Sequence, residues 1–133
     1  MSVTVNLLAV LTAAVSTFLL GGLWYSKALF GAAWTRESGD MRKAGEAGHP
    51  ARVFGVSFVF ALVAAFAYAI VVPAPTVPGQ AAMFGLIVGA GIVAASFGIN
   101  YQFGNRTTKL WLIDGGYHTL QFLIYGLVIG LWR

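Results

Sequence analysis

The stretch VFGVSFVFALVAAFAYAIVV, residues 53–72, decides the fold, because it contains no charged side chain. A helix rises about 1.5 Å per residue, so about 20 apolar residues cross the hydrocarbon core of a bilayer, which is about 30 Å thick. Residues 3–26 and 81–103 are also free of charge, and residues 110–132 contain one charged residue, Asp114. The pattern predicts four transmembrane helices.

The overall composition agrees with a chain that lies mostly in lipid. Hydrophobic residues make up 59% of the sequence and charged residues only 9%, which is too few for a water-soluble surface. Lipid offers the backbone no hydrogen-bond partners, and the alternating pattern of barrel strands is absent, so helices are the spanning form. We expect an all-α, four-helix transmembrane bundle in which residues 1–133 form a single membrane domain.

The residue types exclude several classes of chemistry. The chain has no cysteine, which excludes disulfides, thiolate zinc sites and cysteine nucleophiles. Of its two histidines, His118 lies in a predicted span and His49 in a connection, so a multi-histidine metal site would require several subunits. No glycine-rich nucleotide fingerprint is present. We expect no metal, no cofactor and no nucleic-acid partner, and we assign no catalytic residue.

The basic residues predict the orientation of the chain. Of the eight Lys and Arg residues, five lie in the connection 27–52 and two in the connection 104–109, whereas residues 73–80 have none. The positive-inside rule places the two basic connections in the cytoplasm and both termini outside, in the inner (plasma) membrane of a cell. Anionic lipid head groups account for these charges. Residues 36–43 fit a solvated loop or a short surface helix, with a partner-binding segment as the alternative.

Aromatic and small residues mark the surfaces of the predicted helices. Trp24, Trp34 and Trp111 lie near the expected water interfaces, where amphipathic rings are favoured. Small residues recur at four-residue spacing in several spans, which allows close packing of helices in lipid. At least one such face should be internal, and a homodimer through Gly126 and Gly130 is an open alternative.

Polar side chains in the last two predicted spans require an explanation. A carboxylate at the bilayer centre costs about 2.5–3.5 kcal/mol on insertion scales, so Asp114 is unexpected in lipid. His118 and Gln121 follow at i+4 and i+7 and share its helix face. The short connection makes the last two spans antiparallel neighbours, so Asn100 and Asp114 should lie at similar depth. The candidate polar cluster comprises Tyr25, Asn100, Arg106, Asp114, Tyr117, His118 and Gln121.

Two interpretations of this cluster stay open. In the structural one, Asp114 complements the helix dipole and pairs with Arg106, while His118 bonds to Asp114 or Asn100. In the functional one, the side chains line a polar pocket that opens toward the cytoplasm and handle a proton or a small polar ligand. The first function class is therefore small-solute or proton transport or binding, in a homo-oligomer. A structural or accessory subunit of a membrane complex is the alternative, and a membrane enzyme acting on lipid or quinone through His118 ranks third.

Two stretches of the sequence resemble the signatures of a known family. The first is Gly21-Gly22-Leu23-Trp24-Tyr25-Ser26 with Leu29-Phe30-Gly31 and Trp34, and the second is Asn100, Phe103, Arg106, Lys109-Leu110, Leu112-Ile113-Asp114-Gly115-Gly116-Tyr117 and Gly126. In this order they are similar to the bacterial integral membrane family catalogued as domain of unknown function 1761, over nearly the whole chain. Lys27 stands where proline is expected in that family, so the turn that leaves the first helix should differ. The family has no established activity. The resemblance implies four helices and a polar cluster that includes Asn100, Arg106 and Asp114.

Overall fold

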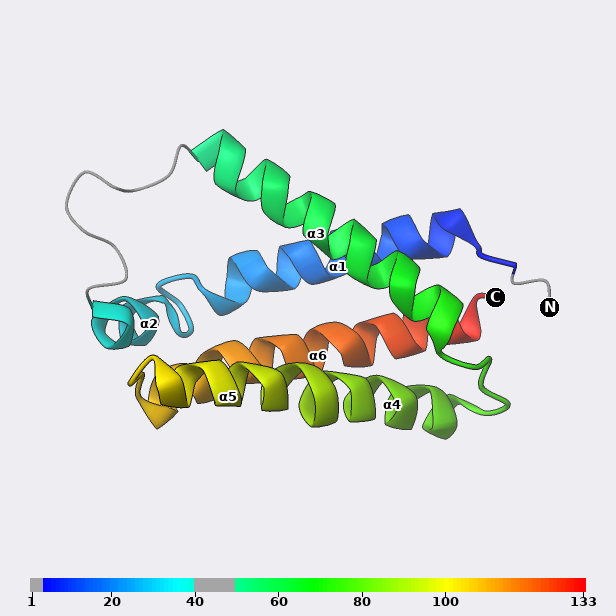
Figure 1. Cartoon of the computed structure of the whole chain (residues 1–133). Coiled ribbons are helices and arrows are strands. Elements are labelled where there is room, and N and C mark those ends of the chain that lie inside the picture. The colour runs from blue at the N-terminus through cyan, green and yellow to red at the C-terminus, as the bar shows by residue number, and fades with distance from the viewer. Residues whose placement is uncertain (1–3, 40–49) are drawn as a thin grey trace.

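The computed structural model describes residues 4–39 and 50–133. In this part of the chain every regular element is a helix, which confirms the all-α expectation. Figure 1 shows the elements in one bundle. In chain order they are α1 Leu7–Trp24, α2 Gly31–Ser38, α3 Pro50–Val71, α4 Pro78–Leu86, the π-helical segment η2 Ile87–Ala94, α5 Ala95–Phe103 and α6 Thr108–Leu131.

Three helices are long and apolar enough to cross a membrane. They are Leu7–Trp24, Ala51–Val71 and the continuous helix Pro78–Phe103, which contains α4, η2 and α5. These correspond to the first three predicted spans. The fourth, residues 110–132, is not among them, although α6 is 24 residues long. The reason lies in its composition, because α6 carries Asp and His side chains that the other three helices lack.

Helix α6 is the central element of the fold. It contacts α1, α2, α3, α4, η2 and α5, and its buried residues recur along its whole length. A helix that is covered by its neighbours meets little lipid, so its sequence need not be uniformly apolar. The structure also contains α2 within the first predicted connection. Residues 40–43 of the charged run predicted there lie outside the described residues.

The helix ends follow local sequence signals. Helix α3 ends just before Pro73, which cannot continue it, and α4 begins with Pro78 in its first turn, where a missing N–H costs nothing. Thr107 caps α6, since its hydroxyl oxygen accepts a hydrogen bond from the backbone N–H of Leu110 at 3.1 Å. Between α5 and α6, Asn105 adopts a positive φ of 53°. The turns are therefore built by residues suited to them.

The two termini meet at one end of the bundle (Figure 1). The side-chain amide of Asn6, which caps α1, donates to the carbonyl oxygen of Trp132 at 2.8 Å. The guanidinium of Arg133 donates to the carbonyl oxygens of Ala69 at 2.9 Å and Val72 at 2.6 Å. A cation at the C-terminal end of α3 also complements the helix dipole. These contacts tie α1, α3 and α6 together at this end.

Small residues bring α4 and η2 against α6. A Cβ atom on Gly89 would lie 2.8 Å from the Cα of Thr119, and one on Gly85 would collide with the backbone of Phe122. The prediction that a small-residue face is internal is therefore confirmed. Gly126 and Gly130 are buried against α4 and the preceding turn of the same chain. The predicted homodimer face through these two glycines is wrong, because the chain itself covers it.

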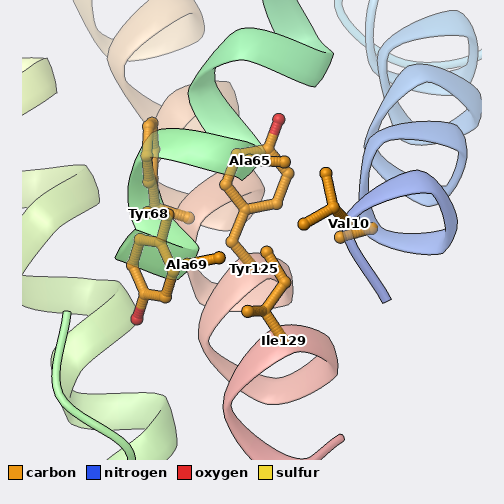
Figure 2. Packing of buried hydrophobic residues seen from close by; sticks show 8 residues of the cluster. Val10, Ala65, Tyr68, Ala69, Tyr125 and Ile129 are labelled. Atoms are coloured by element: carbon orange, nitrogen blue, oxygen red, sulfur yellow. The ribbon is translucent and has the colours of Figure 1, made fainter. Parts of the chain in front are cut away.

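An apolar core joins α1, α3 and α6 near the termini. Figure 2 shows Val10 from α1 facing Tyr125 and Ile129 from α6, with Ala65 and Ala69 from α3 beside them. The phenol ring of Tyr125 is completely buried. By contrast, the N-terminal half of α3 is largely exposed, and it is drawn at the outside of the bundle in Figure 1.

Candidate functional site

Asp114 lies in the second turn of α6 and is only 8% exposed. Its Oδ1 atom accepts a hydrogen bond from the Tyr25 hydroxyl at 2.6 Å, and its Oδ2 atom accepts one from the Tyr101 hydroxyl. Tyr25 follows the end of α1 and Tyr101 belongs to α5. No ion pair holds this carboxylate within residues 4–39 and 50–133. The side chain therefore links three helices through two neutral phenols.

A tight turn brings Tyr25 to this position. The chain turns back after α1, with the N–H of Gly31 donating to the carbonyl oxygen of Ser26 at 2.9 Å. A Cβ atom on Gly31 would lie 2.8 Å from the carbonyl carbon of Ser26, so only glycine fits. The turn starts α2, whose Trp34 ring packs edge-on against Tyr25 with ring centroids 6.1 Å apart. Lys27 is exposed in this turn, and its side chain makes no hydrogen bond or ion pair with the described residues.

Two of the indoles predicted to lie near the water interfaces donate hydrogen bonds between helices. Trp24 donates from Nε1 to the carbonyl oxygen of Ile113 at 2.9 Å, and Trp111 donates to that of Ala94 at 2.8 Å. Ala94 is the last residue of the π-helical segment. Glycines leave room for both rings, since Gly116 faces Trp24 and Gly98 faces Trp111. Trp24 therefore bonds α1 to α6, and Trp111 bonds α6 to η2. Their position near the membrane surface stays a prediction.

His118 belongs to a second chain of hydrogen bonds. Its Nδ1 atom lies 2.6 Å from Oε1 of Gln121, and Nε2 of Gln121 donates to the Tyr125 hydroxyl at 2.8 Å. That hydroxyl donates to the carbonyl oxygen of Ala61 in α3 at 2.9 Å. Because an amide oxygen only accepts, this arrangement places the proton of His118 on Nδ1. The imidazole stacks on Phe97 with centroids 4.9 Å apart.

The predicted cluster thus divides into two groups. The expectation that His118 bonds to Asp114 or Asn100 is wrong, because its hydrogen-bond partner is Gln121. Tyr117 stands between the groups, with its ring centroid 5.6 Å from that of Tyr25 and 5.1 Å from that of His118. Its hydroxyl donates to the carbonyl oxygen of Thr17 at 2.9 Å.

Asn100 does not join Asp114. Its side chain is exposed and makes no hydrogen bond in the described part of the chain, while the neighbouring Tyr101 takes the expected place. The sequence pattern predicts the amide of Asn100 at the depth of Asp114, whereas the phenol of Tyr101, one residue further on, takes this place. A phenol has an apolar body and a polar tip, which suits it to this depth.

Arg106 does not pair with Asp114 either, so that part of the structural interpretation is wrong. It lies in the α5–α6 connection beside a pocket of about 230 Å³. Tyr101 also lines this pocket, so the phenol that bonds to Asp114 stands between the carboxylate and the opening. A larger pocket of about 500 Å³ lies between α1 and α3, lined only by apolar residues.

The described residues contain no group of three or more His, Asp or Glu side chains placed to hold a metal ion. The arrangement offers one buried carboxylate, one buried imidazole and several phenols. These groups can accept, donate and relay protons.

Comparisons with known proteins place this architecture in a family. No curated protein and no solved structure matches the chain. The family described as Protein of unknown function (DUF1761) matches residues 8–130, which include all but one residue each of α1 and α6 and every residue of the two polar groups. Its description names no activity, substrate or partner. The chain therefore belongs to the family Protein of unknown function (DUF1761).

Proposed function

We propose that this chain is a four-span membrane protein that transports or binds a proton or a small polar solute, with Asp114 as its protonation site. The observation that carries the proposal is the environment of the carboxylate, which is buried among helices and accepts hydrogen bonds from Tyr25 and Tyr101 without a cationic partner in the described residues. Ionisable groups inside a membrane domain are costly and mark functional sites by default.

The proposal takes α6 as the fourth span. Its 24 residues are long enough, at about 1.5 Å per residue, to cross a hydrocarbon core of about 30 Å. Its polar side chains Asp114 and Gln121 are buried, whereas Leu112 and Leu131 are exposed. The helix therefore presents apolar residues where lipid can reach it.

With four spans, the positive-inside rule sets the proposed orientation. The basic residues Lys27, Arg36, Arg52, Arg106 and Lys109 belong to the turn after α1, to α2, to the first turn of α3, to the α5–α6 connection and to the first turn of α6. These segments lie at the end of the bundle opposite the termini (Figure 1). That end is cytoplasmic in an inner (plasma) membrane, and both termini are outside. The polar group around Asp114 lies at the same end, where protons and solutes of the cytoplasm can reach it.

Protonation of Asp114 would change its contacts with both neighbouring helices. An ionised carboxylate only accepts, so both phenols donate to it. A protonated carboxyl has a donor of its own and is a weaker acceptor at that oxygen, so the phenol bond to it weakens or reverses. Because Tyr101 lines the pocket beside Arg106, release of this phenol would couple proton binding to the shape of the opening.

The test combines infrared spectroscopy with proton flux. In nanodiscs, we expect the wild type to gain the carbonyl band of a buried carboxylic acid as the pH falls, and Asp114→Asn to lack this band. In liposomes with a trapped pH dye, we expect Asp114→Asn to slow dissipation of an imposed pH gradient by at least about tenfold.

Thr119→Val is the matched control for this experiment. It removes a hydroxyl of α6 that bonds only within its own helix, to the carbonyl oxygen of Gly115 at 2.7 Å. This variant should behave as the wild type in both measurements. Equal proton flux in Asp114→Asn and the wild type, together with an unchanged infrared spectrum, would contradict the proposal.

A structural or accessory subunit is the second candidate, and one observation favours it. Trp24, Trp111, Tyr117 and Tyr125 all donate to backbone carbonyl oxygens of other helices. Such bonds hold helices together without any transport. If this is their role, the wild type carries no protons, and Asp114→Asn lowers thermal stability alone. No contact in residues 4–39 or 50–133 favours an enzyme that uses His118.

A further inference from the structure

A small polar pocket lies between the end of α5 and the start of α6. Its volume is about 230 Å³, below the range of about 300–1,000 Å³ typical of drug-sized ligands. A pocket of this size suits a small charged group. The lining consists of hydroxyl, amide, indole and guanidinium groups and includes no acidic residue: Gly98, Tyr101, Gln102, Arg106, Thr107, Thr108 and Trp111.

Arg106 is the only charged residue of this lining. Arg106 is half-buried and forms no ion pair in the part of the chain that the structure describes. Asp114 forms no ion pair with it, and the hydrogen bonds of its two carboxylate oxygens come from Tyr25 and Tyr101. A partly buried positive charge gains from an anionic partner. The planar fork of five N–H donors fits the oxygens of a phosphate group.

Exposed apolar side chains next to the pocket favour a lipid over a free ion as the source of such a phosphate. Ile99 lies three residues before Gln102, and Leu112 lies four residues after Thr108, so each sits about one turn closer to the middle of the bundle. Both are largely exposed, at 61% and 59%. A free phosphate ion would make no use of these apolar side chains, whereas lipid chains would cover them.

From these observations we propose that the pocket binds the phosphate group of an anionic phospholipid through Arg106, with an acyl chain over Ile99 and Leu112. Basic pockets between membrane helices on the cytoplasmic side are suited to anionic head groups. Gln102 and Thr108 supply further hydrogen-bond donors beside the guanidinium. Its binding group is Arg106 and not Asp114, although Tyr101 lines the pocket and also bonds to Asp114.

Native mass spectrometry of the detergent-extracted full chain tests the site. Phosphatidylglycerol and phosphatidylcholine are titrated into the wild type, Arg106→Gln and Lys109→Gln. Lys109→Gln is the matched control, because it removes the same charge as Arg106→Gln. Lys109 is exposed in the first turn of α6 and does not line the pocket. We expect Arg106→Gln to lower the affinity for the first phosphatidylglycerol molecule by about tenfold, and Lys109→Gln to lower it by less than about twofold.

Three results would overturn the inference. Equal weakening by both variants would mean diffuse attraction to the basic end of the bundle. Equal affinity of the wild type for phosphatidylcholine and phosphatidylglycerol would remove the anionic selectivity. Displacement of phosphatidylglycerol by an excess of inorganic phosphate would make a free phosphate ion the ligand.

Arg106→Lys keeps the experiment decisive if Arg106→Gln does not fold. An ammonium group retains the charge but cannot bind two phosphate oxygens through a planar fork, so affinity should fall about threefold. Affinity equal to that of the wild type would contradict recognition by the fork. The readout is lipid affinity and not proton movement, so its failure leaves the proposal for Asp114 untouched.

Discussion

The two ends of the bundle hold their helices together by different means. At the end with the termini, small residues let α4 pack closely on α6, and an apolar core joins α1, α3 and α6. At the other end, Tyr and Trp side chains reach between helices and bond to Asp114 or to backbone carbonyls. Lipid tails are as apolar as the side chains, so close packing and hydrogen bonds must supply the association. One end therefore relies on close backbone packing, and the other on hydrogen bonds from polar and aromatic side chains.

The largest effect should come from the close-packed end. Gly85→Ala places a Cβ atom against the backbone of Phe122, which cannot move aside like a flexible side chain. We expect a loss of about 3 kcal/mol in unfolding free energy, measured by titration with sodium dodecyl sulfate in mixed micelles. Gly91→Ala is the control, because nothing lies within 4 Å of its Cβ. Equal stability of the two variants would refute the contrast between the ends.

Removal of the carboxylate should have the next largest effect. Asp114→Ala leaves the hydroxyls of Tyr25 and Tyr101 without their acceptor, at a cost of about 2 kcal/mol in the same unfolding titration. Thr119→Val serves again as the control on α6. A loss of unfolding free energy smaller than that of the control would show that the two phenols find other acceptors. The stability of this end of the bundle would then not depend on Asp114.

The indole bond at the end of η2 should contribute less. Trp111→Phe keeps a ring but removes the N–H that donates to the carbonyl oxygen of Ala94, which costs about 1 kcal/mol. Hydrogen exchange should rise at the amides of residues 95–99, since this bond holds the start of α5 on α6. Trp132→Phe, at a partly exposed position, is the control and should leave exchange there unchanged. Unchanged exchange in both variants would remove the role assigned to Trp111.

The smallest effect should come from the C-terminal cap. Arg133→Gln removes the cation that donates to Ala69 and Val72 at the end of α3, and should cost about 0.5 kcal/mol. The effect should shrink at high salt, because part of it is a charge–dipole interaction. Arg52→Gln, which alters the opposite end of α3, controls for the change in net charge. A salt-independent loss would point to the hydrogen bonds alone.

The main features of the fold could be predicted from the sequence. Charge-free runs locate the three apolar helices, because about 20 consecutive apolar residues are enough to cross the hydrocarbon core. The inward placement of Asp114 and Gln121 also follows from their shared helix face and the cost of exposing them to lipid. The roles of the polar residues and the orientation in the membrane stay predictions.

The error at Asn100 has a specific physical cause. Ala81, Gly85 and Gly89 are buried at four-residue spacing, but the next buried position is Ala94, five residues on. The π-helical segment η2 inserts this extra step, so the inner face of α5 is shifted by one residue. A continuous α-helix would have carried the face on toward Asn100, whereas the shift brings Tyr101 to Asp114. Apolar composition contains no sign of such a segment, so the partner could not be predicted.

The central position of α6 has a consequence for biosynthesis. Membrane helices enter the bilayer in the order in which the ribosome makes them, and each early one must be stable there by itself before it finds partners. The helices α1, α3 and α4–α5 precede α6 in the chain, so they must be stable in lipid before the element that all of them contact is made. Their apolar composition agrees with this requirement. Helix α6 arrives when its neighbours are already in place. It can therefore bring in Asp114 and His118, residue types that the three earlier apolar helices lack.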